Sequence, residues 1–198
     1  MLDFILEIIG TIAFSLSGAV VGIKKKMGIL GVTTLGIMTA VGGGIVRDVL
    51  IGVTPPSTFR NPIYIVIALV TALIATIPAV YRKLDLDSSL WVLADALGLG
   101  AFTVVGAGAG ASFNNFFLEA FLGISTGVGG GVIRDLCANR IPMIFTTQFY
   151  ALPCVFGAIV YVLLTMVNTD LATIVGFVLV VVLRLLSEKY KWKQRRVR

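Results

Sequence analysis

Long apolar runs separated by short polar connections make up almost the whole chain. No charged residue occurs between Asn61 and Val80, and the stretch from Leu171 to Leu183 is nearly all aliphatic. A helix needs about 20 apolar residues to cross a bilayer. The pattern therefore predicts seven spans, at residues 3–23, 29–52, 61–81, 89–110, 115–137, 146–167 and 170–187. The runs are continuously apolar and do not alternate, which favours helices over a transmembrane barrel.

A Gly-Gly-Gly triplet followed three residues later by Arg-Asp occurs twice, in the second and fifth spans. The two copies comprise Gly42, Gly43, Gly44, Arg47 and Asp48, and then Gly129, Gly130, Gly131, Arg134 and Asp135. Glycine is about 1 kcal/mol worse than alanine inside a helix. Three in succession predict that both spans are broken at the triplets.

The two glycine triplets can be interpreted in two ways. Irregular backbone is tolerated at membrane depth only where it faces protein or a water-filled cavity, so two breaks would present carbonyl groups to a common path for cations. Alternatively, the glycines allow close contact between helices, as other motifs of small residues do. We expect the path, because the triplet is repeated at the same relative place.

The charged pairs that follow the triplets are functional candidates, because charge is expensive inside a membrane. Neighbouring residues on a helix point in different directions. We therefore expect Arg47 to pair with Asp135 and Arg134 with Asp48, or each with nearby backbone. Such pairs would either lock the structure or line the path.

The rest of the first three spans is also repeated. Glu7, Gly10, Phe14, Gly18 and Pro55 recur as Asp95, Gly98, Phe102, Gly106 and Pro142. The single membrane domain, residues 1–198, thus divides into unit 1–85, unit 86–168, and a seventh span with a basic tail, 169–198. Each unit has three spans, so the second is inverted relative to the first. Glu7 and Asp95 either reach the two membrane surfaces or lie at the mouths of the path.

Charge predicts the orientation in the membrane. Only 13% of residues are charged, against about a quarter in soluble domains, and the mean hydropathy is +1.01. Basic residues follow the odd-numbered spans: Lys24, Lys25 and Lys26; Arg82 and Lys83; Arg140; and the tail. The positive-inside rule then places the N-terminus outside and the C-terminus in the cytosol. The tail is expected to attract anionic lipid headgroups and not nucleic acid.

Several kinds of chemistry have no support in the sequence. There is no histidine, which removes His-based metal sites and nucleophile–histidine pairs. Cys137 and Cys154 have no metal-ligand spacing and are expected to be packing residues. No nucleophile–base arrangement is apparent, so we expect neither an enzyme nor a cofactor.

With its twin Gly-Gly-Gly-x-x-Arg-Asp motifs at 42–48 and 129–135, the whole chain resembles prokaryotic trimeric intracellular cation (TRIC) channels. Bacterial proteins with a so-called glycine transporter domain belong to the same group. The resemblance implies a homotrimer in the prokaryotic plasma membrane, with one pore for potassium and sodium in each subunit, bounded by broken spans 2 and 5. Animal members carry lysine after the glycines, where this chain has Arg47 and Arg134, so their lipid and calcium regulation is not expected here.

Two functions fit these features. The first is a passive channel for monovalent cations, and the second is a secondary transporter of a small solute such as glycine. Inverted repeats and broken helices occur in both classes. The sequence shows no further polar residues suited to an amino-acid zwitterion, which favours the channel.

Overall fold

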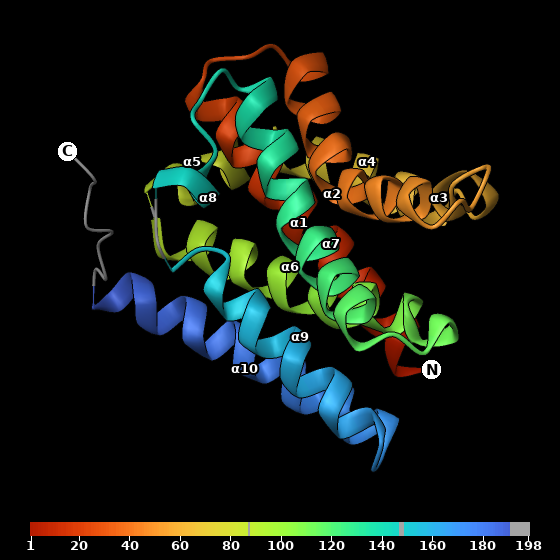
Figure 1. The fold of residues 1–198 in the computed structure, drawn as a ribbon. Helices are drawn as coiled ribbons and strands as arrows, with labels where there is room; N and C mark the ends of the chain where they lie inside the picture. Colours follow the sequence, from red (N-terminus) through yellow and green to blue (C-terminus); the bar gives the residue numbers. More distant parts are fainter. Residues whose placement is uncertain (87, 147–148, 191–198) are drawn as a thin grey trace.

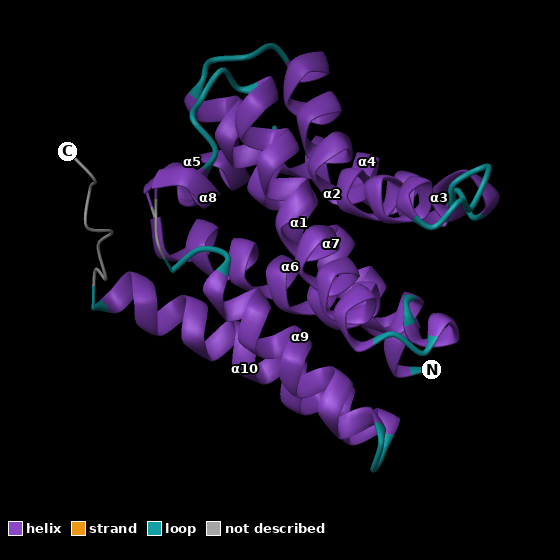
Figure 2. Ribbon diagram, viewed as in Figure 1, coloured by secondary structure: helices purple, strands orange, loops and turns teal. Residues whose placement is uncertain are grey.

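The computed structural model describes residues 1–86, 88–146 and 149–190, and all regular structure in these ranges is helical (Figure 2). The longer helices are α1 (Leu2–Lys24), α2 (Ile29–Leu50), α4 (Ile63–Ala75), α6 (Ser88–Ala109), α7 (Phe116–Cys137), α9 (Leu152–Thr165) and α10 (Thr169–Lys189). The shorter ones are α3 (Ser57–Arg60), α5 (Pro78–Leu86), η1 (Ala111–Phe113) and α8 (Met143–Thr146). The predicted basic tail lies outside the described residues from position 191 onward.

Side-chain caps mark where two of the long helices begin. The Asn115 side chain accepts a hydrogen bond of 3.1 Å from the Leu118 backbone N–H, at the start of α7. At the start of α10, Asn168 accepts one of 2.9 Å from Leu171. Each bond satisfies a donor that a helix N-terminus otherwise leaves free, which fixes the end of the helix.

The long helices form two similar sets with one helix added (Figure 1). Helices α1, α2 and α4 pack together, as do α6, α7 and α9. The sets meet where α1 lies against α6 and where α2 lies against α7. Helix α10 makes its extensive contacts with α6 and α9, so it covers the second set. No described helix covers the first set in the same way.

Contacts between the two sets are reciprocal. A Cβ atom built on Gly10 would lie 3.1 Å from the ring of Phe102, and one built on Gly98 would overlap the ring of Phe14. These four residues are the equivalent positions of the predicted units. The two rings themselves pack at a centroid distance of 5.3 Å in the middle of the bundle.

Both glycine triplets lie inside continuous helix, so the prediction that α2 and α7 are broken at 42–44 and 129–131 is wrong. The triplets instead bring the two helices together. A Cβ on Gly129 would lie only 3.1 Å from the Cα of Gly43. This is the close helix contact that the sequence offered as the alternative.

Backbone contact explains why the helices tolerate these glycines. A Cβ on Gly43 would overlap the carbonyl oxygen of Thr126, and a Cβ on Gly130 would overlap that of Thr39. No side chain fits between the two backbones. The lower helix propensity of glycine is offset by the dispersion contacts that this approach allows.

Five helices, namely α1, α2, α6, α7 and α10, are long and apolar enough to cross a membrane by length and composition. The other two predicted spans, 61–81 and 146–167, are shorter than expected, since α4 has 13 residues and α9 has 14. Helices of that length measure about 20 Å, less than the hydrocarbon thickness of about 30 Å. Proline accounts for part of this, because Pro62 precedes α4, Pro78 begins α5 and Pro153 lies in the first turn of α9.

Candidate functional site

The first ion group consists of Arg47, Asp48 and Ser57, where α2 ends and α3 begins. Arg47 Nε donates to Asp48 Oδ1 at 2.9 Å. The other carboxylate oxygen, Asp48 Oδ2, accepts both the backbone N–H and the hydroxyl of Ser57, each at 2.6 Å. Asp48 thereby holds the start of α3 against the end of α2, while Arg47 compensates its charge.

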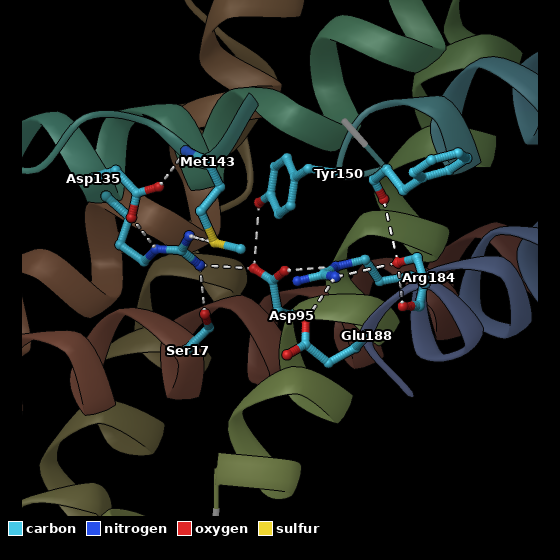
Figure 3. A network of polar contacts seen from close by, with 10 residues as sticks. Ser17, Asp95, Asp135, Met143, Tyr150, Arg184 and Glu188 are labelled. Atoms are coloured by element: carbon cyan, nitrogen blue, oxygen red, sulfur yellow. Dashed lines mark hydrogen bonds and ion pairs between the residues drawn. The ribbon is translucent and has the colours of Figure 1, made fainter. Parts of the chain in front are cut away.

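The second ion group is built in the same way around Arg134 and Asp135, where α7 ends and α8 begins (Figure 3). Arg134 Nε donates to Asp135 Oδ1 at 3.0 Å, and Asp135 Oδ2 accepts the backbone N–H of Met143 at 3.1 Å. Arg134 Nη1 goes further, donating to Ser17 Oγ and to Asp95 Oδ1, both at 2.7 Å. Helices α1, α6 and α7 are thus joined at one fully buried guanidinium.

Asp95 and Arg184 extend the second ion group to α10 (Figure 3). Arg184 Nε lies 3.5 Å from Asp95 Oδ2, and its Nη1 lies 3.4 Å from Glu188 Oε2. Tyr150 donates its hydroxyl to Asp95 Oδ1 at 3.3 Å, and its ring lies under the Arg184 guanidinium at 5.3 Å. Asp95 and Arg184 are both 0% exposed, so this carboxylate compensates two buried arginines.

The predicted pairing between the two motifs, Arg47 with Asp135 and Arg134 with Asp48, is wrong. Each arginine instead folds back on the aspartate that follows it. The triplets of α2 and α7 cross with the chains running in opposite directions, because Gly43 meets Thr126 while Thr39 meets Gly130. The charged ends of the two helices therefore lie on opposite sides of the crossing. The arginine side chain is long enough to reach the carboxylate of the next residue, although the two side chains leave the helix in different directions.

Asp95 does not reach a membrane surface as the sequence allowed, since its carboxylate is held inside the bundle by Arg134, Arg184 and Tyr150. Its counterpart Glu7 is half-buried. Glu7 accepts a short hydrogen bond from the hydroxyl of Tyr64. Equivalent carboxylates thus have different surroundings.

Two cavities adjoin the first ion group. The larger, of about 790 Å³, is lined by residues near the N-terminus and in the α6–α7 connection. These two parts of the chain lie side by side at one end of the bundle (Figure 1). The smaller, of about 30 Å³, extends inward to Gly44 and Phe102. Glu7, Arg47 and Ser57 line both cavities. The two cavities are therefore neighbours that share a wall formed by these side chains.

The predicted site residues thus fall into three sets. Arg47 and Gly44 line the cavities. Asp48, Arg134 and Asp135 are buried in the ion groups. The remaining glycines lie at or beside the α2–α7 crossing: Gly42, Gly43, Gly129, Gly130 and Gly131.

Sequence reasoning did not single out Arg184. The position directly follows the aliphatic run that ends at Leu183, still within the predicted seventh span. An arginine inside a span is a signal for a buried carboxylate partner, and Asp95 is that partner. Ser17, Ser57 and Tyr150 were also missed, and their residue types carry no comparable signal.

The sequence profile described as glycine transporter matches the chain twice, at residues 4–79 and 92–166. Among curated proteins, the inner membrane protein YadS of Escherichia coli is 36% identical over 98% of this chain and 95% of its own length. The membrane protein YvgT of Bacillus subtilis is 37% identical, over 96% and 93% of the two chains. The two profile matches together cover most of the chain.

Solved structures identify the family. A TRIC cation channel structure is 39% identical, covers 100% of this chain and 98% of its own, and superposes with a TM-score of 0.90. The chain belongs to the prokaryotic TRIC channel family. A prokaryotic TRIC channel crystallised in 0.5 M KCl is 32% identical, over 98% and 99% of the two chains, with a TM-score of 0.89. The TRIC orthologue of Rhodobacter sphaeroides is 28% identical, over 96% and 98%, with a TM-score of 0.87. Like these relatives, this TRIC family member is an integral membrane protein.

Proposed function

We propose that this TRIC family member is a passive channel for potassium and sodium, with one pore in each subunit of a homotrimer. The observation that carries the proposal is the pair of cavities sharing Glu7, Arg47 and Ser57. The larger cavity is open to the outside and is lined by these side chains. The smaller cavity reaches Gly44 of α2, which has free space beside it. A Cβ on Gly44 would have no neighbour closer than 3.9 Å, so this glycine, unlike Gly43, is not needed for packing.

The path runs between two inverted units, as the sequence predicted. Reciprocal contacts support this arrangement, because equivalent residues exchange places across a twofold axis. Gly43 meets Thr126 where Gly130 meets Thr39. Helices α4 and α9, although short, complete the seven crossings. The N-terminus is outside and the C-terminus cytosolic, according to the distribution of lysine and arginine.

A pore in each subunit follows from both units belonging to one chain. The neighbours of this family are described as trimeric, and three copies of this chain would hold three separate paths. Apolar side chains are then expected on the threefold axis, with no ion passage there. Each path would end on opposite sides at the first and second ion groups, whose carboxylates favour cations.

We infer that Phe14 and Phe102 close the proposed path in this conformation. The smaller cavity ends at Phe102, and Phe14 is completely buried beside it. Beyond them, Asp95 and Arg134 of the second ion group are fully buried. Conduction therefore requires these rings to move, as at a hydrophobic constriction that opens by hydration.

Recording from purified protein in planar bilayers tests the channel. We expect unitary current steps that reverse at the potassium equilibrium potential when potassium is the only permeant cation. Gly44→Val should lower the unitary conductance by filling the smaller cavity, whereas Gly28→Ala, at a position with no neighbour within 4 Å, should not. Saturable uptake of glycine into proteoliposomes without current steps would contradict a channel and support a transporter.

A further inference from the structure

One carboxylate on the wall of the larger cavity has no protein partner among the described residues. Glu119, in the first turn of α7, is only 8% exposed and lines the cavity. Its carboxylate makes no hydrogen bond or ion pair with any residue that the structure describes, whereas the other buried carboxylates, Asp48, Asp95 and Asp135, are all paired. Because no described protein group compensates this charge, the carboxylate is available to a cation that enters the cavity.

The other charges around the cavity do not supply that partner. Asp3 and Glu7 add two more carboxylates to the wall. Arg47 is the single basic residue lining the cavity, and it is already paired with Asp48 at 2.8 Å. The lining residues therefore carry a formal charge of −2, three carboxylates against one guanidinium. A cavity lined by charge of one sign, within apolar walls, raises the local concentration of the opposite ion.

The chemistry of the wall selects a class of ion. No three acidic, histidine or cysteine side chains in the described ranges come together closely enough to hold a metal ion. The carboxylates are spread around the opening, which suits small, rapidly exchanging monovalent cations. A divalent ion would need several oxygen ligands at short range.

We propose that Glu119 is the principal cation-binding residue of an antechamber at this mouth, with Asp3 and Glu7 in support. The antechamber, defined by Asp3, Glu7, Glu119 and the cavity that they line, concentrates potassium or sodium before the ions reach Arg47. This inference rests on the proposed channel function. It adds a specificity-determining residue outside the Gly-Gly-Gly-x-x-Arg-Asp motifs.

Conductance at two salt concentrations tests the antechamber. Glu119→Gln should lower the unitary potassium conductance about threefold or more at about 0.05 M KCl. At about 1 M KCl the Debye length is about 3 Å, so the variant and the unaltered protein should agree. Asp170→Asn is the matched control, because it removes an exposed carboxylate at the start of α10 that does not line the cavity, and it should change neither value.

A purely structural role for Glu119, such as stabilising the N-terminus of α7, would not depend on salt in this way. Equal conductance in the variant and the unaltered protein at low salt, or equal loss at both salt concentrations, would overturn the proposal. Glu119→Asp should retain most of the low-salt conductance.

Thallium, a heavy monovalent stand-in for potassium, tests binding without conduction. Crystals of the full chain soaked in a thallium salt should show an anomalous peak at Glu119 that is absent from the Glu119→Gln variant. The proposal requires both the peak and the low-salt effect, and the absence of either overturns it. If the unaltered protein gives no unitary currents, the channel function fails instead, and the peak decides separately whether the cation site exists.

Discussion

The two ion groups share one plan but have different surroundings. In both, an arginine near the end of a long helix binds the aspartate that follows it, and that aspartate accepts the first backbone N–H of a short helix. Yet Arg134 is 0% exposed, while Arg47 is 8% exposed and lines two cavities. Equivalent sequence therefore produces one group whose arginine is fully buried and one whose arginine borders an opening.

Helix α10 causes this difference. It packs on α6 and α9 and brings Arg184 to Asp95. The first set has no such helix, so Glu7, the counterpart of Asp95, binds Tyr64 and faces the cavity. Two repeated units can thus build the same kind of ion group, while a helix outside the repeat determines which of the two groups borders a cavity.

The largest expected effect is the difference in stability lost on replacing Arg134 or Arg47. Arg134→Met would leave Asp135 unpaired inside the bundle and remove one of the two arginines that compensate Asp95. We expect a loss of about 3–5 kcal/mol in the free energy of unfolding. Arg47→Met should lose only about 1 kcal/mol, because Arg47 borders both cavities and Asp48 keeps its two hydrogen bonds from the start of α3. Unfolding in mixed detergent micelles measures both, and equal losses would show that the groups do not differ in hydration.

Removing Arg184 should make the second ion group more like the first, which has no partner from α10. Arg184→Met deletes the ion pair to Asp95 and the contact over the Tyr150 ring. We expect a loss of about 2 kcal/mol, since Arg134 still compensates the carboxylate. Lys189→Met, one turn further along α10 at an exposed position, is the control and should lose less than about 0.5 kcal/mol. A similar loss in both variants would contradict the role given to α10.

The glycine crossing should respond equally from both sides. Gly43→Ala and Gly130→Ala each place a methyl group against a carbonyl oxygen of the other helix. We expect each to destabilise the protein by about 2 kcal/mol. Gly44→Ala, in the same triplet, has open space and should be neutral or stabilising by about 0.5 kcal/mol. Unfolding of the three variants in the same micelles provides the measurement, and a large loss for Gly44→Ala would indicate that the whole triplet packs.

The sequence predicted the apolar helices and the family, because hydrophobic runs and repeated motifs are local signals. It failed where a local rule competes with a tertiary contact. Glycine propensity predicted breaks at 42–44 and 129–131, but helix packing holds both helices intact. Side-chain divergence argued against the pair Arg47–Asp48, yet the antiparallel crossing puts the predicted partner Asp135 on the opposite side from Arg47. Burial of Arg184 depends on how α10 lies on α6, which no periodicity specifies.

The smallest expected difference concerns two tyrosines that donate to the equivalent carboxylates. Tyr150 is 0% exposed and donates to Asp95 at 3.3 Å, whereas Tyr64 donates to the half-buried Glu7. Tyr150→Phe should destabilise the protein by about 1–1.5 kcal/mol, because no water can replace the lost donor. Tyr64→Phe should lose less than about 0.5 kcal/mol, because a water molecule in the adjoining cavity can donate to Glu7 instead. Unfolding of the two single variants and of the double variant measures the difference, and the two losses should add, because the tyrosines share no partner. A larger loss at Tyr64 than at Tyr150 would mean that the first group is the dry one in the membrane.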